Sequence, residues 1–263
     1  MTHSWIVRIC HTLVASVVLP YVCLAADANS LSDTIEKIKP AVVAIGTFQK
    51  TRRPPSVFRG TGFVTADGLH VITNAHVLPE KIDADKRETI AVYAGNTSKM
   101  EIREATKVGE DRDHDLAVLK ITGRPLPSLT LGKSQPVREG EIYAFTGFPI
   151  GMVLGLNPVT HRGIISAISP IAIPQLSAQL LEKNLVARLT APYNVYQLDA
   201  TAYPGNSGSP LYDPSSGQVI GIVNKVFVQE SKETVIQKPS GISYAIPVSH
   251  IRDLLRQLGI DVN

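Results

Sequence analysis

Hydrophobic and polar residues form short strand-like runs along most of the chain, with few long helical patterns. In the first half, these runs are rich in β-branched residues and end at Gly, Pro, Asp or Asn; they cover 41–48, 60–65, 70–77, 89–95 and 115–121. A second series covers 141–149, 159–168, 195–201, 218–226 and 243–248. Many short strands separated by turn residues are typical of all-β barrels and sandwiches. The two series predict two similar barrels of about six strands each.

Three segments depart from this strand pattern. The polar stretch 27–40 predicts a short helix that ends before Pro40. Leucines recur at helical spacing within 175–189, which predicts an amphipathic helix inserted between strands. The stretch 248–260 predicts a C-terminal helix that stops at Gly259 and packs on the barrels. The apolar face of this last helix consists of Ile251, Leu254, Leu255 and Leu258.

The first 25 residues differ in composition from the rest of the chain. They contain one Arg, no acidic residue and a mostly apolar stretch from Ile9 to Leu24, followed by Ala25. This pattern predicts a secretory signal peptide that is cleaved after Ala25. An uncleaved membrane anchor is the alternative, but Pro20 and several polar residues make the stretch short and poor for a membrane span. We therefore expect an exported protein, periplasmic or secreted, with no stable membrane span after cleavage.

Charge and cysteine content exclude several function classes. The 26 basic and 23 acidic residues leave a small, scattered excess, with no basic cluster among aromatic residues, so nucleic acid is not expected as a partner. Both cysteines, Cys10 and Cys23, lie within the predicted signal peptide. The mature protein would then have no disulfide, no cysteine nucleophile and no thiolate metal site.

These patterns predict five parts along the chain. They are a signal peptide at 1–25, an N-terminal segment at 26–40, a first barrel at 41–134, a second barrel at 135–247 and a C-terminal helix and tail at 248–263. No internal repeat or low-complexity tract interrupts this order. Because few residues follow the last helix, we expect no further domain after it.

One histidine and one aspartate lie at the ends of apolar runs. His76 follows the run VITNA, where a strand gives way to a loop, and such a strand end can hold a general base rigidly at the edge of a cleft. A purely structural histidine is the alternative. Asp115 opens the run DLAVLKI, which predicts a partly desolvated carboxylate at the mouth of a buried strand. The other acids are interpreted as solvated surface charges, including Asp111 and Asp113 in the loop before Asp115.

The stretch YPGNSGSPL at 203–211 contains a candidate nucleophile, Ser207, among residues that build tight turns. A serine hydroxyl needs an imidazole to accept its proton, and the imidazole needs a carboxylate to orient it. His76 and Asp115 supply both groups. Glycines at 205 and 208 allow the backbone to bend, so that the N–H groups of Gly205 and Ser207 form an oxyanion hole.

Together these motifs resemble the trypsin-like serine proteases. TNAHV, DLAVLKI, GNSGSPL and GIVN occur in the order and spacing of that family, and GTGFV, VTHRGIISAI and ISYAIPVSHIRDLL narrow the resemblance to its HtrA/Deg branch. The resemblance covers about residues 40–258. It implies two perpendicular six-stranded antiparallel barrels with the active site between them. It also implies His76 as general base, Asp115 as orienting acid and Ser207 as nucleophile, with no metal or organic cofactor.

The resemblance implies a serine endopeptidase whose partners are protein or peptide substrates. A catalytically silent or partner-activated relative that binds unfolded polypeptide is the alternative. Family members usually carry PDZ domains after the protease domain, for which this chain leaves no room. Many form trimers through the segment before the first barrel, but 27–40 is polar and lacks aromatic residues here, so an oligomer stays an open alternative. The stretch 169–194 is longer than expected and is either regulatory or extra packing.

Alignment on Ser207 also predicts the pocket for the substrate residue before the cut. Thr201 falls at the pocket base, where specificity for Arg or Lys requires an acid. Residues Asn224, Lys225 and Val226 form the second wall, and Val226 fills the space needed by large aromatic side chains. Val223 stands where glutamyl endopeptidases carry a histidine. We therefore expect a shallow apolar pocket for Val, Ala, Ile or Thr, with Lys225 favouring acidic residues nearby.

Overall fold

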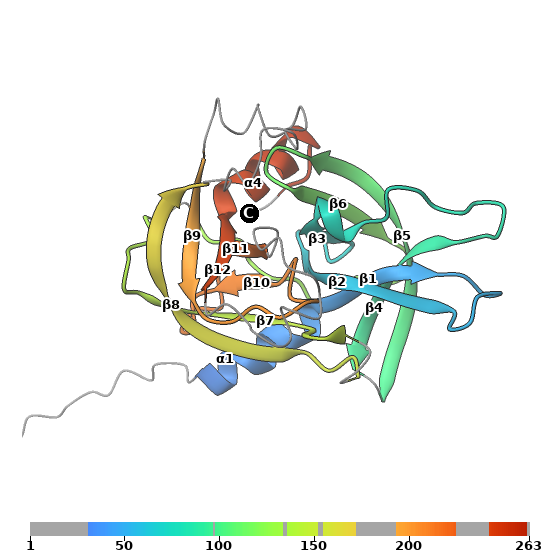
Figure 1. Cartoon of the computed structure of the whole chain (residues 1–263), viewed down its shortest axis with the longest axis horizontal. Helices are drawn as coiled ribbons and strands as arrows, with labels where there is room; N and C mark the ends of the chain where they lie inside the picture. Colours follow the sequence, from blue (N-terminus) through green and yellow to red (C-terminus); the bar gives the residue numbers. More distant parts are fainter. Residues whose placement is uncertain are drawn as a thin grey trace, which may run out of the picture.

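The strands of the protein close into two antiparallel barrels, as the computed structural model shows (Figure 1). The structure describes residues 31–96, 98–133, 136–151, 155–171, 193–224 and 242–261. The first barrel has the hydrogen-bonded order β1-β2-β3-β6-β5-β4 and the second the order β10-β11-β12-β9-β8-β7. The predicted all-β fold of two six-stranded barrels is therefore confirmed.

The elements of the first barrel begin after a short N-terminal helix, α1 (Leu31–Ile38), and a 3₁₀ turn, η1 (Lys39–Ala41). Its strands are β1 (Val42–Phe48), β2 (Ser56–Thr65), β3 (His70–Asn74), β4 (Thr89–Asn96), β5 (Lys99–Asp111) and β6 (Leu116–Ile121), and a second 3₁₀ turn, η2 (Ala75–Val77), follows β3. Because Pro40 lacks an N–H and lies in η1, the α-helix ends before it, as predicted.

The second barrel contains β7 (Ile142–Gly147), β8 (Val159–Pro170), β9 (Asn194–Asp199), β10 (Pro210–Tyr212), β11 (Val219–Asn224) and β12 (Ile242–Pro247). Helix α4 (Val248–Gln257) follows directly. The helix stops as predicted, because Gly259 adopts a positive φ of 68° and lets the Ile260 N–H donate to the Leu255 carbonyl at 2.9 Å.

Two strands were not predicted from the hydrophobic pattern. In β5, only Arg103 and Ala105 are buried, so the strand shows no apolar run even though it pairs with both β4 and β6 and closes the barrel. In β10, only three residues pair with the neighbouring strands. Both strands are therefore identified by their hydrogen bonding and not by composition.

One buried apolar cluster joins the two barrels and α4. It includes Phe63 and Leu116 of the first barrel, Ile222 of the second barrel and Leu255 of the helix, all essentially inaccessible to solvent. Burying each such side chain contributes about 1.5–3 kcal/mol relative to exposure. The predicted packing of the C-terminal helix on the barrels is confirmed, and the shared cluster fixes how the barrels face each other.

Two predictions lie outside the described residues: the signal peptide at 1–25 and the inserted helix at 175–189. Among the described helices, none combines the length and the apolar character that a membrane span requires.

Candidate functional site

The His76 side chain comes from the end of β3, as the sequence pattern predicted. The strand ends at Asn74, and His76 lies in the single 3₁₀ turn η2 that follows. The Arg59 guanidinium Nε of β2 donates to the carbonyl of Val77 at 2.7 Å and so holds the end of this turn. The imidazole is about a third exposed, with 38% of its side-chain surface accessible, and can therefore meet a bound molecule.

The backbone of Asp115 is hydrogen-bonded to the segment that carries His76. Asp115 lies directly before β6, is 7% exposed and adopts a positive φ of 52°, which is uncommon for a residue other than glycine. Its carbonyl accepts hydrogen bonds from the Ala75 N–H at 3.1 Å and from Asn74 Nδ2 at 3.0 Å. These two bonds fix the aspartate relative to η2.

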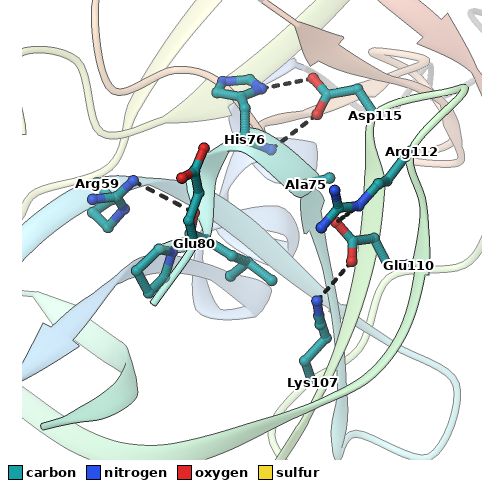
Figure 2. Close-up of a pocket in the computed structure, with 10 residues that line it drawn as sticks. Arg59, Ala75, His76, Glu80, Lys107, Glu110, Arg112 and Asp115 are labelled. Carbon is teal, nitrogen blue, oxygen red and sulfur yellow. Dashed lines mark hydrogen bonds and ion pairs between the residues drawn. The ribbon is translucent and has the colours of Figure 1, made fainter. Parts of the chain in front are cut away.

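The Asp115 carboxylate accepts three hydrogen bonds. Oδ1 accepts the backbone N–H of His76 at 2.9 Å, and Oδ2 accepts His76 Nδ1 at 2.6 Å and Asn224 Nδ2 at 2.8 Å. Figure 2 shows the two bonds to His76 as dashed lines. A buried carboxylate is stable only when donors satisfy it, and here both oxygens are satisfied. When a neutral imidazole donates its Nδ1–H to the carboxylate, Nε2 is unprotonated, as a general base requires.

The Ser207 loop is bent at two glycines, as predicted. Gly205 and Gly208 have φ values of 101° and 91°, a region that other residues rarely adopt. A Cβ at Gly208 would overlap the Thr61 carbonyl, and a Cβ at Gly205 would overlap the Phe148 carbonyl. The loop therefore needs glycine at both positions for conformation and for close approach.

The Ser207 backbone is attached to the barrel that carries His76. Its carbonyl accepts the N–H of Thr61 in β2 at 2.8 Å. Gly60 lies between the two segments, since a Cβ there would come within 2.7 Å of the Val77 side chain and 3.0 Å of the Ser207 carbonyl. Across the described residues, no hydrogen bond joins His76 to the Ser207 hydroxyl. Catalytic hydrogen bonds of this type often tighten only when a substrate binds.

Two backbone N–H groups in the loop are available to a ligand. Within the described part of the chain, neither the Gly205 N–H nor the Ser207 N–H donates a hydrogen bond, whereas those of Asn206, Gly208 and Ser209 donate to backbone carbonyls. An oxyanion hole requires donors that are free to bind a developing negative charge.

The predicted specificity residues are placed only in part. Thr201 is half-buried, while Lys225 and Val226 lie outside the described residues. Asn224 was expected in the pocket wall, but its side chain is buried and its amide donates to Asp115. Sequence reasoning missed this contact; the only signal was a polar residue at the end of the apolar strand GIVN.

A cavity of about 400 Å³ opens beside His76 on the first barrel (Figure 2). Charged side chains line much of it, and Glu110 pairs there with Lys107 at 2.6 Å and with Arg112 at 3.1 Å. His76 and Asp115 form one wall. The cavity is thus a polar extension of the site rather than an apolar pocket.

The four other histidines that the structure describes also have partners. His70 pairs with Asp67 at 2.8 Å, and His114 pairs with Asp111 at 2.7 Å. His250 of α4 stacks on His114 with ring centroids 3.9 Å apart, and burial lowers its pKa, with a further lowering by His114. His161 stacks on Phe145, and burial lowers its pKa as well. No hydrogen bond among the described residues joins any of these rings to Ser207.

Comparison with known proteins adds a family assignment to this geometry. Residues 60–222, more than half of the chain, match the model of the trypsin-like peptidase domain. The chain is 32% identical over 237 residues to "Serine protease HTRA2, mitochondrial" of Bos taurus, covering 87% of this chain and 43% of that protein. It is 32% identical over 206 residues to "Probable periplasmic serine endoprotease DegP-like" of Halomonas elongata, covering 77% and 35%. The chain thus spans less than half the length of these relatives.

Solved structures show the same similarity. The serine endoprotease from Yersinia pestis matches with a TM-score of 0.61 and 25% identity, over 87% of this chain and 66% of that chain. An HtrA-type protease with a tripeptide matches with a TM-score of 0.62 and 28% identity, over 87% and 63%.

Proposed function

Because the chain belongs to the trypsin-like peptidase family and is an HtrA-like member of it, we propose that it is an exported serine endopeptidase. His76 is the general base, Asp115 orients it and Ser207 is the nucleophile. The substrates are peptide bonds of unfolded proteins. The five-part division of the chain into signal peptide, N-terminal segment, two barrels and C-terminal helix belongs to the same proposal.

The acylation step follows from the placement of these groups. The Ser207 Oγ attacks the scissile carbonyl carbon while its proton passes to His76 Nε2. Asp115 stabilises the resulting imidazolium through its bond to Nδ1 and does not itself accept the proton. The N–H groups of Gly205 and Ser207 bind the oxyanion of the tetrahedral intermediate. The imidazolium then donates its proton to the leaving amine, the C–N bond breaks, and an acyl ester remains on Ser207.

Deacylation repeats these roles with water. His76 Nε2 accepts a proton as the water oxygen attacks the ester carbonyl, and the same two N–H groups bind the second oxyanion. Collapse of this intermediate breaks the C–O bond to Ser207, which regains its proton from His76. The carboxylic acid product leaves, and the enzyme returns to its starting protonation state.

The observation that supports this proposal most directly is the satisfied Asp115 carboxylate. One of its oxygens accepts His76 Nδ1 at 2.6 Å, and the other accepts the backbone N–H of the same residue at 2.9 Å. This pair of bonds holds the ring in one orientation and one tautomer. The free N–H groups of the neighbouring loop supply the second requirement of acyl transfer.

A fluorophosphonate probe tests the proposal, because it reacts only with an activated serine. Purified mature wild-type protein is incubated with the probe, and the labelled residue is identified by mass spectrometry. We expect labelling at Ser207, and none in Ser207→Ala with an unchanged circular dichroism spectrum. Labelling that appears only after a peptide or partner is added would instead indicate a partner-activated relative.

Export and cleavage specificity belong to the same proposal. Amino-terminal sequencing of natural material is expected to begin near Ala26, and a mature chain that retains Cys10 would contradict export by signal cleavage. The pocket at Thr201 is proposed to accept small aliphatic residues.

A further inference from the structure

A single threonine, Thr61, links the first barrel to the loop before the proposed nucleophile. It lies in the middle of β2, has no solvent-accessible surface and is found in the motif GTGFV. None of the roles assigned above requires a hydroxyl at this position. Its hydrogen bonds, however, reach across the boundary between the two barrels.

Every polar atom of Thr61 is bonded. Its N–H donates to the Ser207 carbonyl at 2.8 Å, and its carbonyl accepts the Thr73 hydroxyl at 2.7 Å. Its own hydroxyl donates to the Gly205 carbonyl at 2.7 Å and accepts the Phe148 N–H at 3.1 Å. The backbone of Thr61 therefore fixes one end of the loop, and its side chain fixes the other.

The side chain has this position because its neighbours leave room for it. A Cβ at Gly147 would overlap the Ser209 hydroxyl and would lie 3.0 Å from Thr61 Oγ1. In the described part of the chain, the buried side-chain polar groups of Asn206 and Ser209 have no hydrogen-bond partner. Thr61 is thus the side chain that ties this loop to the first barrel.

We propose that Thr61 is a positioning residue that holds the oxyanion hole in its binding-competent form. This inference rests on the proposed peptidase function. Glycine peptides rotate at little conformational cost, so the peptide groups around Gly205 need an external contact to keep one orientation. The Pro204–Gly205 peptide, which carries the Gly205 N–H, is held at its carbonyl by the Ile150 N–H at 2.6 Å. The Thr61 hydroxyl holds the carbonyl of the next peptide, Gly205–Asn206, so the peptide groups on both sides of Gly205 are fixed and the Gly205 N–H stays free to bind the oxyanion.

The role predicts a loss in turnover rather than in substrate affinity. The oxyanion forms only in the transition state and the tetrahedral intermediate, so a misoriented donor lowers kcat and leaves KM nearly unchanged. Removing the hydroxyl leaves the Gly205 carbonyl and the Phe148 N–H without their partner. The usual cost of a buried unpaired group corresponds to roughly a ten- to hundredfold loss in kcat.

Three variants of the full mature chain test this role. Thr61→Val keeps the shape and removes the hydroxyl, and Thr61→Ser keeps the hydroxyl. Thr65→Val is the matched control, because Thr65 lies in the same strand, is equally buried and donates its hydroxyl to the Leu129 carbonyl at 3.1 Å, away from the loop. Steady-state kinetics on a peptide substrate give kcat and KM separately.

We expect Thr61→Val to lose kcat by roughly ten- to hundredfold with KM within about threefold. Thr61→Ser and Thr65→Val should both keep kcat within about threefold. A wild-type kcat in Thr61→Val, or an equal loss in Thr65→Val, would overturn the proposal. If Thr61→Val does not fold, Thr61→Cys, with a weaker S–H donor, is expected to show a partial loss of kcat, and full activity in it would overturn the role.

Hydrogen exchange separates this inference from the proposed function. Exchange at residues 203–209, followed by mass spectrometry, reports the order of the loop without any need for catalysis. We expect faster exchange there in Thr61→Val than in the wild type or in Thr65→Val. Unchanged exchange would refute the positioning role even in an active enzyme, whereas a wild-type protein that neither hydrolyses peptides nor reacts at Ser207 would refute the proposed function alone.

Discussion

Replacing Asp115 by asparagine should invert the tautomer of His76, and the structure indicates why. The substitution replaces one carboxylate oxygen by an NH₂ group of nearly the same size. Oδ1 accepts the backbone N–H of His76, and Oδ2 accepts His76 Nδ1 and Asn224 Nδ2. Since a backbone N–H cannot become an acceptor, the amide oxygen must face it. The NH₂ group then takes the place of Oδ2.

In that position, the NH₂ group faces Asn224 and His76. Both donate to Asp115 in the wild type, and both can become hydrogen-bond acceptors. The Asn224 amide can rotate to present its oxygen, and the His76 ring can move its proton from Nδ1 to Nε2. If the proton instead stayed on Nδ1, the His76 Nδ1–H and the new NH₂ group would face each other. Two buried donors would then be unsatisfied, at about 1–3 kcal/mol each. The total of about 2–6 kcal/mol lowers the population of the competent tautomer by roughly 30- to 10⁴-fold. Loss of the carboxylate charge that stabilises the imidazolium moves the result toward the upper value.

The assay measures both turnover and tautomer. We expect kcat/KM on a peptide substrate to fall by about 10³- to 10⁴-fold. Imidazole ¹⁵N chemical shifts should show His76 protonated on Nε2 in Asp115→Asn and on Nδ1 in the wild type. A variant that keeps a tenth of the wild-type kcat/KM, or that keeps the Nδ1 proton, would refute this reasoning.

Asp67→Asn is the matched control for this experiment. Asp67 also binds a histidine and a backbone amide, since its Oδ1 accepts His70 Nδ1 at 2.8 Å and the Leu69 N–H at 2.9 Å. His70 lies at the start of β3, whereas His76 lies beyond its end. We expect kcat/KM within about twofold of the wild type for this variant.

Three further outcomes follow from the fold and the proposed site. Leu255→Ala should lower the free energy of unfolding by about 2–5 kcal/mol in urea denaturation, because Leu255 is fully buried where α4 meets both barrels. Burial lowers the pKa of His250 in the folded protein. As the pH falls below about 6.5, this residue therefore takes up a proton more readily in the unfolded chain than in the folded protein. Stability should therefore decrease from pH 7 toward pH 5, and the decrease should be shallower in His250→Phe; an equal slope in both proteins would contradict this. Cuts in denatured casein, mapped by mass spectrometry, should fall mainly after Val, Ala, Ile or Thr, with graded preferences, since one methylene of fit contributes about 1–3 kcal/mol. A majority after Arg, Lys, Glu or Phe would contradict the pocket at Thr201.

Much of the fold was predictable because most strands are buried on at least one face. Runs such as 41–48 and 115–121 are almost continuously apolar, and the structure shows both as buried strands. The strand β5 escaped prediction because it exposes most of its side chains and carries charges at many positions. Its place in the barrel depends on backbone hydrogen bonds to β4 and β6, which leave no trace in composition.

The pairing of His76 with Asp115 follows from the sequence around each residue and from the pairing of strand β3 with strand β6. Each residue was placed at a strand end from its own neighbours in the sequence. Pairing of β3 with β6 aligns Asn74 with Leu116, so the residues just beyond these strand ends meet at the same edge of the barrel. Because the strands are antiparallel, the end of one lies beside the start of the other.

The sequence by itself determined where the Ser207 loop turns and which apolar runs form buried strands, and it predicted the candidate site residues, because those properties depend on near neighbours in the chain. Only the tertiary structure decided which side chains from distant parts of the chain meet. Asn224 reaches Asp115 across 109 positions, and Thr61 reaches Gly205 across 144. Both contacts cross from one barrel to the other, and their geometry depends on the shared buried cluster that sets how the barrels pack. No local pattern records that packing, since it arises from the fit of side chains distributed over the whole chain.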